Sequence, residues 1–262
     1  MIPRWQAPVR IALLVAAVLA LPSASFAQVK VIVSGGFAAA YREVLPEFER
    51  TTGIKVTTTS GASFGNAPNT IGAQLRRGVA ADVVIMSREG MSELMAANRI
   101  APGTDADLAR TPIGVAVRAG AAKPDVRTVE AFKQVVLKAK LVAVPSSTSG
   151  IFLRDEVFPR LGIADKVRFK LTPRGTDATA MVASGEADIG LLPVSEIVHA
   201  RGVELAGVIA DEIQLNQVFA AAVVAGSKEI EAAKRLIAFL ASERASGTIR
   251  SSGMEPLGKG HN

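Results

Sequence analysis

The sequence contains no cysteine and only two histidines, His199 and His261. The absence of cysteine excludes disulfide bonds, thiol nucleophiles, cysteine-ligated zinc and iron–sulfur clusters. Two histidines are too few for a multi-histidine metal site, so we expect no metal. Basic runs with interleaved aromatic residues are also missing, and nucleic acid is therefore not an expected partner.

Several catalytic motifs are absent as well. The glycine-rich segments match neither a phosphate-binding P-loop nor the G-x-G-x-x-G dinucleotide fingerprint, so we expect no nucleotide cofactor, and no cofactor of any other kind. Two histidines leave little room for a Ser–His–Asp triad. Hydrolase, kinase and dehydrogenase functions are therefore disfavoured, which leaves ligand capture, with or without a proton transfer.

The first 27 residues have the features of a secretory signal peptide. Arg4 and Arg10 precede an unbroken apolar run at 11–21, and Ser25-Phe26-Ala27 places small residues at a cleavage site. The run is too short to span a hydrocarbon layer of about 30 Å. We therefore expect cleavage after residue 27 and a mature protein in the periplasm. Since no cysteine follows the run, lipid attachment at a mature N-terminal cysteine is excluded.

The rest of the chain has the composition of a globular protein. Hydrophobic residues make up 49% of the 262 residues and charged residues 21%, which argues against disorder. Removing 1–27 takes away two arginines and no acid, so the net charge falls from +6 to +4 over 262 − 27 = 235 residues. A chain of this length suits one large α/β unit or two lobes of roughly 110 to 120 residues each.

Strand and helix patterns alternate along the mature chain, which predicts an α/β fold with a mainly parallel sheet and right-handed crossovers. Buried strands are expected at 29–34, 54–59, 82–86, 113–118, 141–144, 167–171, 188–192, 203–209 and 218–224. Helices are expected from 36 to about 53, at 70–77, after Ser87, at 129–138, after Gly150 and at 230–240.

Small and hydroxylated residues follow four of the expected strands. These loops are Ser34-Gly35-Gly36, Ser60 to Ser63, Ser146 to Gly150 and Arg174-Gly175-Thr176. In open α/β sheets such loops gather at the carboxyl ends of the strands, where ligands bind. Helix N-termini offer free amide donors and a positive dipole end. The four loops together predict a site for an anion or another polar ligand.

Segments in a defined order carry a family resemblance. They are FERTTGIKV at 48–56, RGVAADVVI at 77–85, SGIF at 149–152 and SGEADIG at 184–190. In this order the mature chain resembles a type II periplasmic solute-binding protein of the molybdate-binding branch, which also includes a periplasmic aconitate isomerase. The resemblance implies two α/β lobes with a ligand cleft between them. Lobe 1 would comprise 28–112 plus 219–262, and lobe 2 would comprise 126–214, with hinge segments between.

The chain departs from the molybdate-binding pattern at the ligand. Gly36 stands where the family usually has a serine, Pro193 where it has a tyrosine, and Arg88 where it often has an acidic residue. The sole tyrosine, Tyr41, is expected to pack in the first helix. Lost hydroxyl donors and a gained arginine favour carboxylates over a compact oxyanion, because the guanidinium fork binds carboxylates bidentately. The preferred ligand is a small di- or tricarboxylate.

Two functions stay open at this point. One is a cofactor-free isomerase that interconverts cis- and trans-aconitate by allylic proton transfer. The other is a receptor that delivers a carboxylate or a molybdate-like oxyanion to an ABC-transporter permease. Proton transfer needs a group that exchanges a proton near neutral pH, and the candidates near the expected cleft are Glu89, Asp177 and Glu196. The expected ligand-binding residues are Gly35, Gly36, Ser63, Arg88, Ser147, Thr148, Ser149, Gly150, Arg174 and Thr176.

Overall fold

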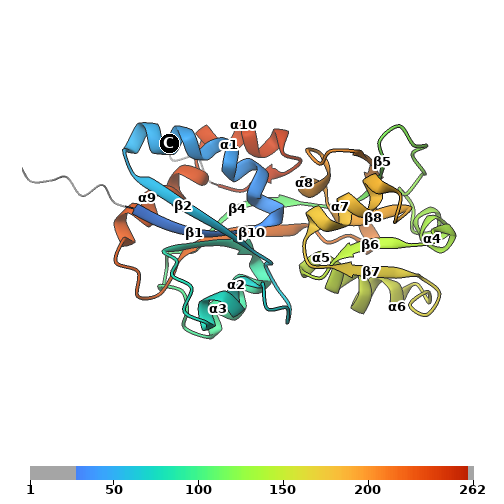
Figure 1. Cartoon of the computed structure of the whole chain (residues 1–262), viewed down its shortest axis with the longest axis horizontal. Helices are drawn as coiled ribbons and strands as arrows, with labels where there is room; N and C mark the ends of the chain where they lie inside the picture. The colour runs from blue at the N-terminus through green and yellow to red at the C-terminus, as the bar shows by residue number, and fades with distance from the viewer. Residues whose placement is uncertain (1–27, 259–262) are drawn as a thin grey trace, which may run out of the picture.

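The computed structural model describes residues 28–258, and the expected signal peptide lies outside these residues. Two separate β-sheets, each with its own helices, form the two ends of an elongated molecule (Figure 1). The first sheet has the order β11-β4-β10-β3-β1-β2 and the second the order β7-β6-β8-β5-β9. The predicted α/β class is therefore confirmed.

The strands agree with most of the expected ranges. The first sheet contains β1 (Gln28–Ser34), β2 (Lys55–Gly61), β3 (Val83–Ser87), β4 (Ala106–Thr111), β10 (Gln217–Val223) and β11 (Glu255–Pro256). The second contains β5 (Ile113–Arg118), β6 (Val142–Pro145), β7 (Phe169–Thr172), β8 (Ile189–Pro193) and β9 (Val203–Val208). The lobe boundaries given above stay a prediction.

Helices connect and cover the strands. They are α1 (Gly35–Thr52), α2 (Ile71–Arg76), α3 (Arg88–Ala96), α4 (Val129–Lys138), α5 (Thr148–Phe152), α6 (Phe158–Arg160), α7 (Gly175–Ser184), α8 (Val194–Ile197), α9 (Ile230–Leu240) and α10 (Glu243–Ser251). A π-helical turn, Leu153–Val157, joins α5 to α6, and a 3-10 turn, Asp211–Ile213, follows β9. In the described residues, no helix is long and apolar enough to cross a membrane.

The expectation of a mainly parallel sheet is wrong. Strand β1 runs parallel to β2 and β3, and β6 runs parallel to β7 and β8. Strand β10 is antiparallel to β3 and β4, and β5 is antiparallel to β8 and β9. The reason is the path of the chain, which crosses between the sheets at each of these strands. Both sheets are therefore mixed.

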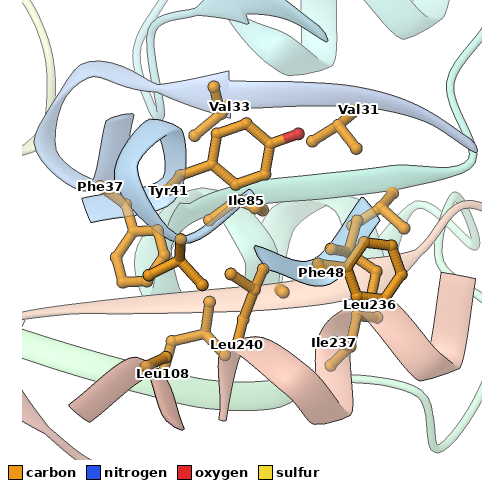
Figure 2. Close-up of a cluster of buried hydrophobic side chains, with 14 of the residues drawn as sticks. Val31, Val33, Phe37, Tyr41, Phe48, Ile85, Leu108, Leu236, Ile237 and Leu240 are labelled. Atoms are coloured by element: carbon orange, nitrogen blue, oxygen red, sulfur yellow. The ribbon is translucent and has the colours of Figure 1, made fainter. Parts of the chain in front are cut away.

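The central strands of the first sheet, β1, β3 and β10, are largely buried on both faces. Val31, Val33 and Ile85 point toward α1 and α9, where they pack with Phe48 and Leu236 (Figure 2). The intervening residues of the same strands face α2 and α3. Alternate side chains of a strand point to opposite faces, so helices on both faces require the continuous apolar strands that the sequence shows.

Tyr41 lies in this core. Its side chain is fully buried, and its hydroxyl is 2.8 Å from Thr58 Oγ1. Burial raises the pKa of the phenol to about 12. The expectation that Tyr41 serves packing is confirmed.

Strand β4 and helix α10 are among the elements that were not expected from the sequence. Strand β4 falls in a stretch with several turn-forming residues, and its pairing with β10 overrides that local preference. Helix α10 has the sequence ERASGTIRS, in which Ile249 is the only large apolar residue. It is held by burial of Ala245 and Ile249 against α1 and α9.

Two segments cross between the sheets, and Gln214 joins them. The first crossing passes from β4 to β5 through Pro112, and the second passes from β9 to β10. The Gln214 amide accepts a hydrogen bond from Ile113 N at 2.6 Å and donates to the carbonyls of Ile113 and Ile209 at 3.1 Å each. One side chain therefore satisfies backbone groups of both crossings.

We predict that Gln214→Ala lowers the free energy of unfolding by about 2 kcal/mol, because it leaves the buried amide of Ile113 without a partner. Urea denaturation measures the change. Gln134→Ala is the matched control, since the exposed Gln134 amide bonds only Glu130 one helical turn away, and it should cost no more than about 0.5 kcal/mol. Equal losses in the two variants would contradict the special role of Gln214.

Candidate functional site

The carboxyl group of Glu196 marks the site where the two halves meet. Glu196 lies on the short helix α8, and its oxygens lie against the first residues of α1 and α7. A Cβ atom built on Gly35 would lie 2.4 Å from Oε1, and one built on Gly175 would lie 1.6 Å from Oε2. Only glycine at these two positions lets the carboxyl group approach both helices. Gly35 is exposed, so the site is open to solvent on that side.

The N-termini of α1 and α7 have free amide groups. The N-cap residues, Ser34 and Arg174, make no side-chain capping hydrogen bond. The first amides of a helix have no partner within the helix, and the aligned peptide dipoles add a positive potential there. Two such ends, from helices of 18 and 10 residues, therefore face one carboxyl group, in an arrangement suited to negative charge.

Burial of Glu196 favours the neutral form of its carboxyl group, whereas the helix N-termini favour the ionised form. It raises the pKa of this carboxyl group from 4.5 to about 7. Within residues 28–258 no basic side chain lies within ion-pair distance of Glu196. The ionised and the neutral form are therefore both populated near neutral pH. A proton acceptor and donor needs this property to work at that pH.

Two buried hydroxyl groups accompany the carboxyl group in the sequence. Ser34 precedes Gly35 and is 2% exposed, and Ser195 precedes Glu196 and is 3% exposed. Among the described residues, neither Oγ atom has a hydrogen-bond partner. An unpaired buried hydroxyl is costly, so both hydroxyl groups are unsatisfied in this closed structure. The site predictions omitted both residues, although Ser34 stood in one of the four loops used for the anion prediction.

Two of the expected loop residues, Ser147 and Thr148, lie in a second contact region between the two halves. Ser87 Oγ lies 2.8 Å from Thr148 Oγ1, and the Phe64 amide donates to Ser147 Oγ at 3.3 Å. Asn69 Nδ2 donates to the carbonyl of Pro173 at 3.2 Å. These hydrogen bonds hold the two halves closed against each other.

Other expected residues have packing roles in this structure. A Cβ atom on Gly36 would lie 2.1 Å from the Phe219 ring, and one on Gly150 would lie 1.8 Å from the carbonyl of Pro145. Ser63 Oγ accepts a hydrogen bond from the Ser87 amide at 2.9 Å. Ser149 is buried and Thr176 is exposed. Their contact with a ligand stays a prediction.

The two arginines expected to bind the ligand are paired with carboxylates of the chain itself. Arg88 bonds Asp105 at 2.6 Å and also Asp107. Arg174 is 65% exposed, and its Nε lies 3.6 Å from Asp177. The Arg88 guanidinium is therefore engaged by two carboxylates, whereas Arg174 makes one loose ion pair and, among the described residues, no side-chain hydrogen bond.

The other two candidate proton carriers are placed less favourably than Glu196. Asp177 faces Arg174, as above. Glu89 lies in the first turn of α3, and its Oε2 is buried with no partner among the described residues. Within the same residues, no cluster of three or more His, Cys, Asp or Glu side chains could hold a metal ion.

Two α/β halves that meet around helix N-termini, joined by two crossing segments, define the class of two-lobed binding proteins. The molybdate-binding protein of Azotobacter vinelandii is similar, with a TM-score of 0.71 and 20% identity over 86% of this chain and 98% of that one. A sulfate-binding protein of Mycobacterium tuberculosis H37Rv gives a TM-score of 0.65 at 20% identity, covering 88% and 87% of the two chains. The predicted two-lobed fold is confirmed.

The chain belongs to the family described as bacterial extracellular solute-binding protein, whose model matches residues 29–255. It is also 35% identical over 260 residues to an aconitate isomerase of a Pseudomonas species, with 98% of each chain covered. The predicted resemblance to the molybdate-binding branch is therefore confirmed.

We predict that Glu196→Gln changes how stability depends on pH. The folded wild type keeps the Glu196 proton up to about pH 7, whereas the unfolded chain releases it near 4.5. Wild-type stability from this group is therefore full below about pH 4.5 and is lost as the pH rises through 7. Glutamine stays neutral, so its contribution to stability does not change with pH. The free energy of unfolding of the variant should therefore rise relative to that of the wild type by roughly 3 kcal/mol between about pH 4.5 and pH 7.

Urea denaturation at pH 5 to 8.5 tests this prediction. Glu231→Gln is the control, because the Glu231 side chain is 84% exposed and pairs only with Lys234 in the next turn. Its difference from the wild type should stay flat across this range. A Glu196→Gln difference that is equally flat would show that Glu196 titrates as an ordinary carboxyl group.

Proposed function

We propose that this protein closes on a small polycarboxylate and interconverts trans- and cis-aconitate by allylic proton transfer, with Glu196 as the proton carrier. The observation that carries the proposal is the Glu196 carboxyl group, held against the N-termini of α1 and α7 with its pKa raised to about 7. The 35% identity to an aconitate isomerase supports the choice of substrate. We further propose that cleavage after residue 27 releases the mature protein into the periplasm.

The chemistry requires one base and no cofactor. Aconitate carries a methylene carbon and an alkene carbon on either side of its central carbon. Ionised Glu196 removes a methylene proton, and the electron pair of that C–H bond spreads over the three carbons. The neutral Glu196 then returns the proton to the former alkene carbon. A new double bond remains where the methylene stood, and the orientation of that carboxymethyl arm sets whether it is cis or trans.

The surroundings of Glu196 fit this sequence of steps. The amides at the start of α1 and α7 stabilise negative charge on substrate carboxylates and on the allylic intermediate. Ser34 and Ser195 provide hydroxyl groups that have no other partner among the described residues. Closure of the halves at Ser87 and Thr148 would reduce the access of water to the intermediate. Arg88 and Arg174 would bind substrate carboxylates after leaving their present partners.

We predict that the purified protein converts trans-aconitate to cis-aconitate and that Glu196→Gln lowers kcat by about 10²–10⁴-fold, since glutamine cannot accept a proton. The wild-type kcat/KM should rise with pH and level off above about 7, because the base must be ionised in the free enzyme. Ultraviolet absorbance or chromatography follows the reaction, and Glu231→Gln should retain full activity. No turnover by the wild type over hours would overturn the proposal.

A second variant displaces the carboxyl group without removing it. The Cβ atom of Gly175→Ala would overlap Glu196 Oε2, so the carboxyl group must move and kcat should fall at least tenfold. Gly247→Ala in α10 is the matched control, because no atom lies within 4 Å of its Cβ position. It should leave kcat unchanged and add about 0.5–1 kcal/mol of stability. Equal activity in both variants would remove the requirement for a fixed Glu196.

The second candidate function is a receptor that delivers a carboxylate or an oxyanion to an ABC-transporter permease. It is favoured by the closed interface at Ser87, Thr148 and Ser147, which can trap a ligand without any chemistry. The similar molybdate- and sulfate-binding proteins share its fold.

Thermal melts discriminate the ligands. We expect trans-aconitate and citrate to raise Tm, because a ligand that binds only the folded state stabilises it, and we expect molybdate to have no effect. At a ligand concentration 100 times Kd the gain is about 2.7 kcal/mol. A rise with molybdate alone would overturn the polycarboxylate assignment, and a rise with carboxylates without turnover would favour the receptor.

A further inference from the structure

Helix α8, which carries Glu196, is too short to hold its own position. It spans only Val194–Ile197, and an isolated helix of one turn is not stable in water. The position of the carboxyl group must therefore come from contacts that α8 makes with the rest of the chain. Besides packing against α1, β5 and β9, α8 contacts the crossing segment before β5 and the turn that follows α10.

The start of α8 is bonded to the first crossing. The Val194 amide donates to the carbonyl of Pro112 at 2.9 Å, and the Ser195 amide donates to Thr111 Oγ1 at 3.4 Å. The Thr111 hydroxyl in turn donates to the carbonyl of Gly253 at 3.0 Å. A continuous chain of hydrogen bonds thus runs from the start of α8 to the turn at 251–253.

The residues after α8 reach the same turn. His199 Nε2 lies 3.1 Å from the carbonyl oxygen of Ser251. This carbonyl can only accept, so the imidazole donates. Ser251 is the last residue of α10, and a donor at a helix C-terminus also meets the negative end of the helix dipole.

The turn at 251–253 also packs against the residues at both ends of α8. Gly253 has a φ of 74°, and a Cβ atom there would lie 2.8 Å from a methyl carbon of Val194 and 3.3 Å from one of Val198. The turn at 251–253 therefore contacts α8 at its start and just beyond its end. Only glycine fits both this backbone conformation and the approach of the two valines.

We propose that the turn at 251–253, acting through the His199 hydrogen bond, positions Glu196 between the N-termini of α1 and α7. His199 is a positioning residue, because it bonds the Ser251 carbonyl and not the carboxyl group itself. This inference rests on the proposed function for the role of Glu196. It adds that the turn at 251–253 controls how well the proton carrier works.

The charged groups on the neighbouring elements are engaged elsewhere. Asp177 of α7 faces Arg174, and Glu204 of β9 pairs with Lys123 at 2.9 Å. Apart from the buried Tyr41, the ionisable residues of α1 begin at Arg42, about two helical turns beyond Gly35, and Arg118 of β5 lies beside Gly185. His199 and Arg201 are the ionisable residues of the segment between α8 and β9, and the experiment below treats His199 directly.

Carbon-detected NMR titration of the Glu196 carboxyl group tests the proposal without relying on turnover. In His199→Ala the carboxyl group should loosen toward solvent, and its midpoint should fall from the wild-type value by roughly one pH unit. His199→Gln keeps a side-chain N–H donor and should restore the wild-type midpoint. His199→Phe keeps a ring but no donor and should behave like the alanine variant. Gly247→Ala should leave the titration unchanged.

Kinetics provide a second readout. We expect His199→Ala to lower kcat about tenfold with little change in KM, and His199→Gln to recover most of the loss. A wild-type midpoint in both donor-lacking variants, or a glutamine variant as impaired as alanine, would overturn the positioning role. If the wild type shows no turnover while the midpoint still depends on a donor at 199, the isomerase assignment fails and the positioning role stands.

Discussion

The organising interaction of this structure is the contact of one carboxyl group with two helix N-termini. Burial withdraws water from Glu196 and favours its neutral form, as the pKa of about 7 shows. The free amides and dipoles of α1 and α7 favour its ionised form. Because these effects oppose each other, a small change in the surroundings of the group can move its proton in either direction. A carboxyl group fully exposed to water, or one paired with an arginine, would lack this balance.

The chain path explains how the contact arises. Helix α1 belongs to the first sheet, and α7 and α8 follow strands of the second. Glu196 therefore meets Gly35 only because the crossings near Pro112 and Gln214 hold the two sheets close together. The antiparallel strands β5 and β10, which break the expected parallel pattern, are the strands next to these crossings. The departure from the simple α/β pattern is thus what brings the two helix ends to one place.

Much of the fold could be predicted from the sequence, because buried strands and amphipathic helices leave local patterns. The range 129–138 for α4 matches the structure, and Tyr41 was correctly assigned to the core. The antiparallel pairing and β4 could not be predicted, since they depend on contacts between residues far apart in the chain. The same limit applies to the site. Glu196 was one of three acidic candidates, and only its depth against Gly35 and Gly175 distinguishes it. Arg88 looked free in the sequence, but Asp105 and Asp107 occupy it.

The carboxyl group also bears on the choice between a receptor and an enzyme. A receptor for a permanently charged oxyanion gains nothing from an ionisable acid against its helix N-termini. The ionised acid would repel the ligand with a Coulomb energy of about 332/(ε·r) kcal/mol, where r is the separation in Å and ε the dielectric constant. An enzyme that moves a proton within a polycarboxylate needs such an acid, with a pKa near the working pH. In such an enzyme the negative charge of the substrate disfavours the ionised form of Glu196. This raises the pKa of the carboxyl group and makes the carboxylate a stronger base. On this physical ground the position of Glu196 favours proton-transfer chemistry over simple capture.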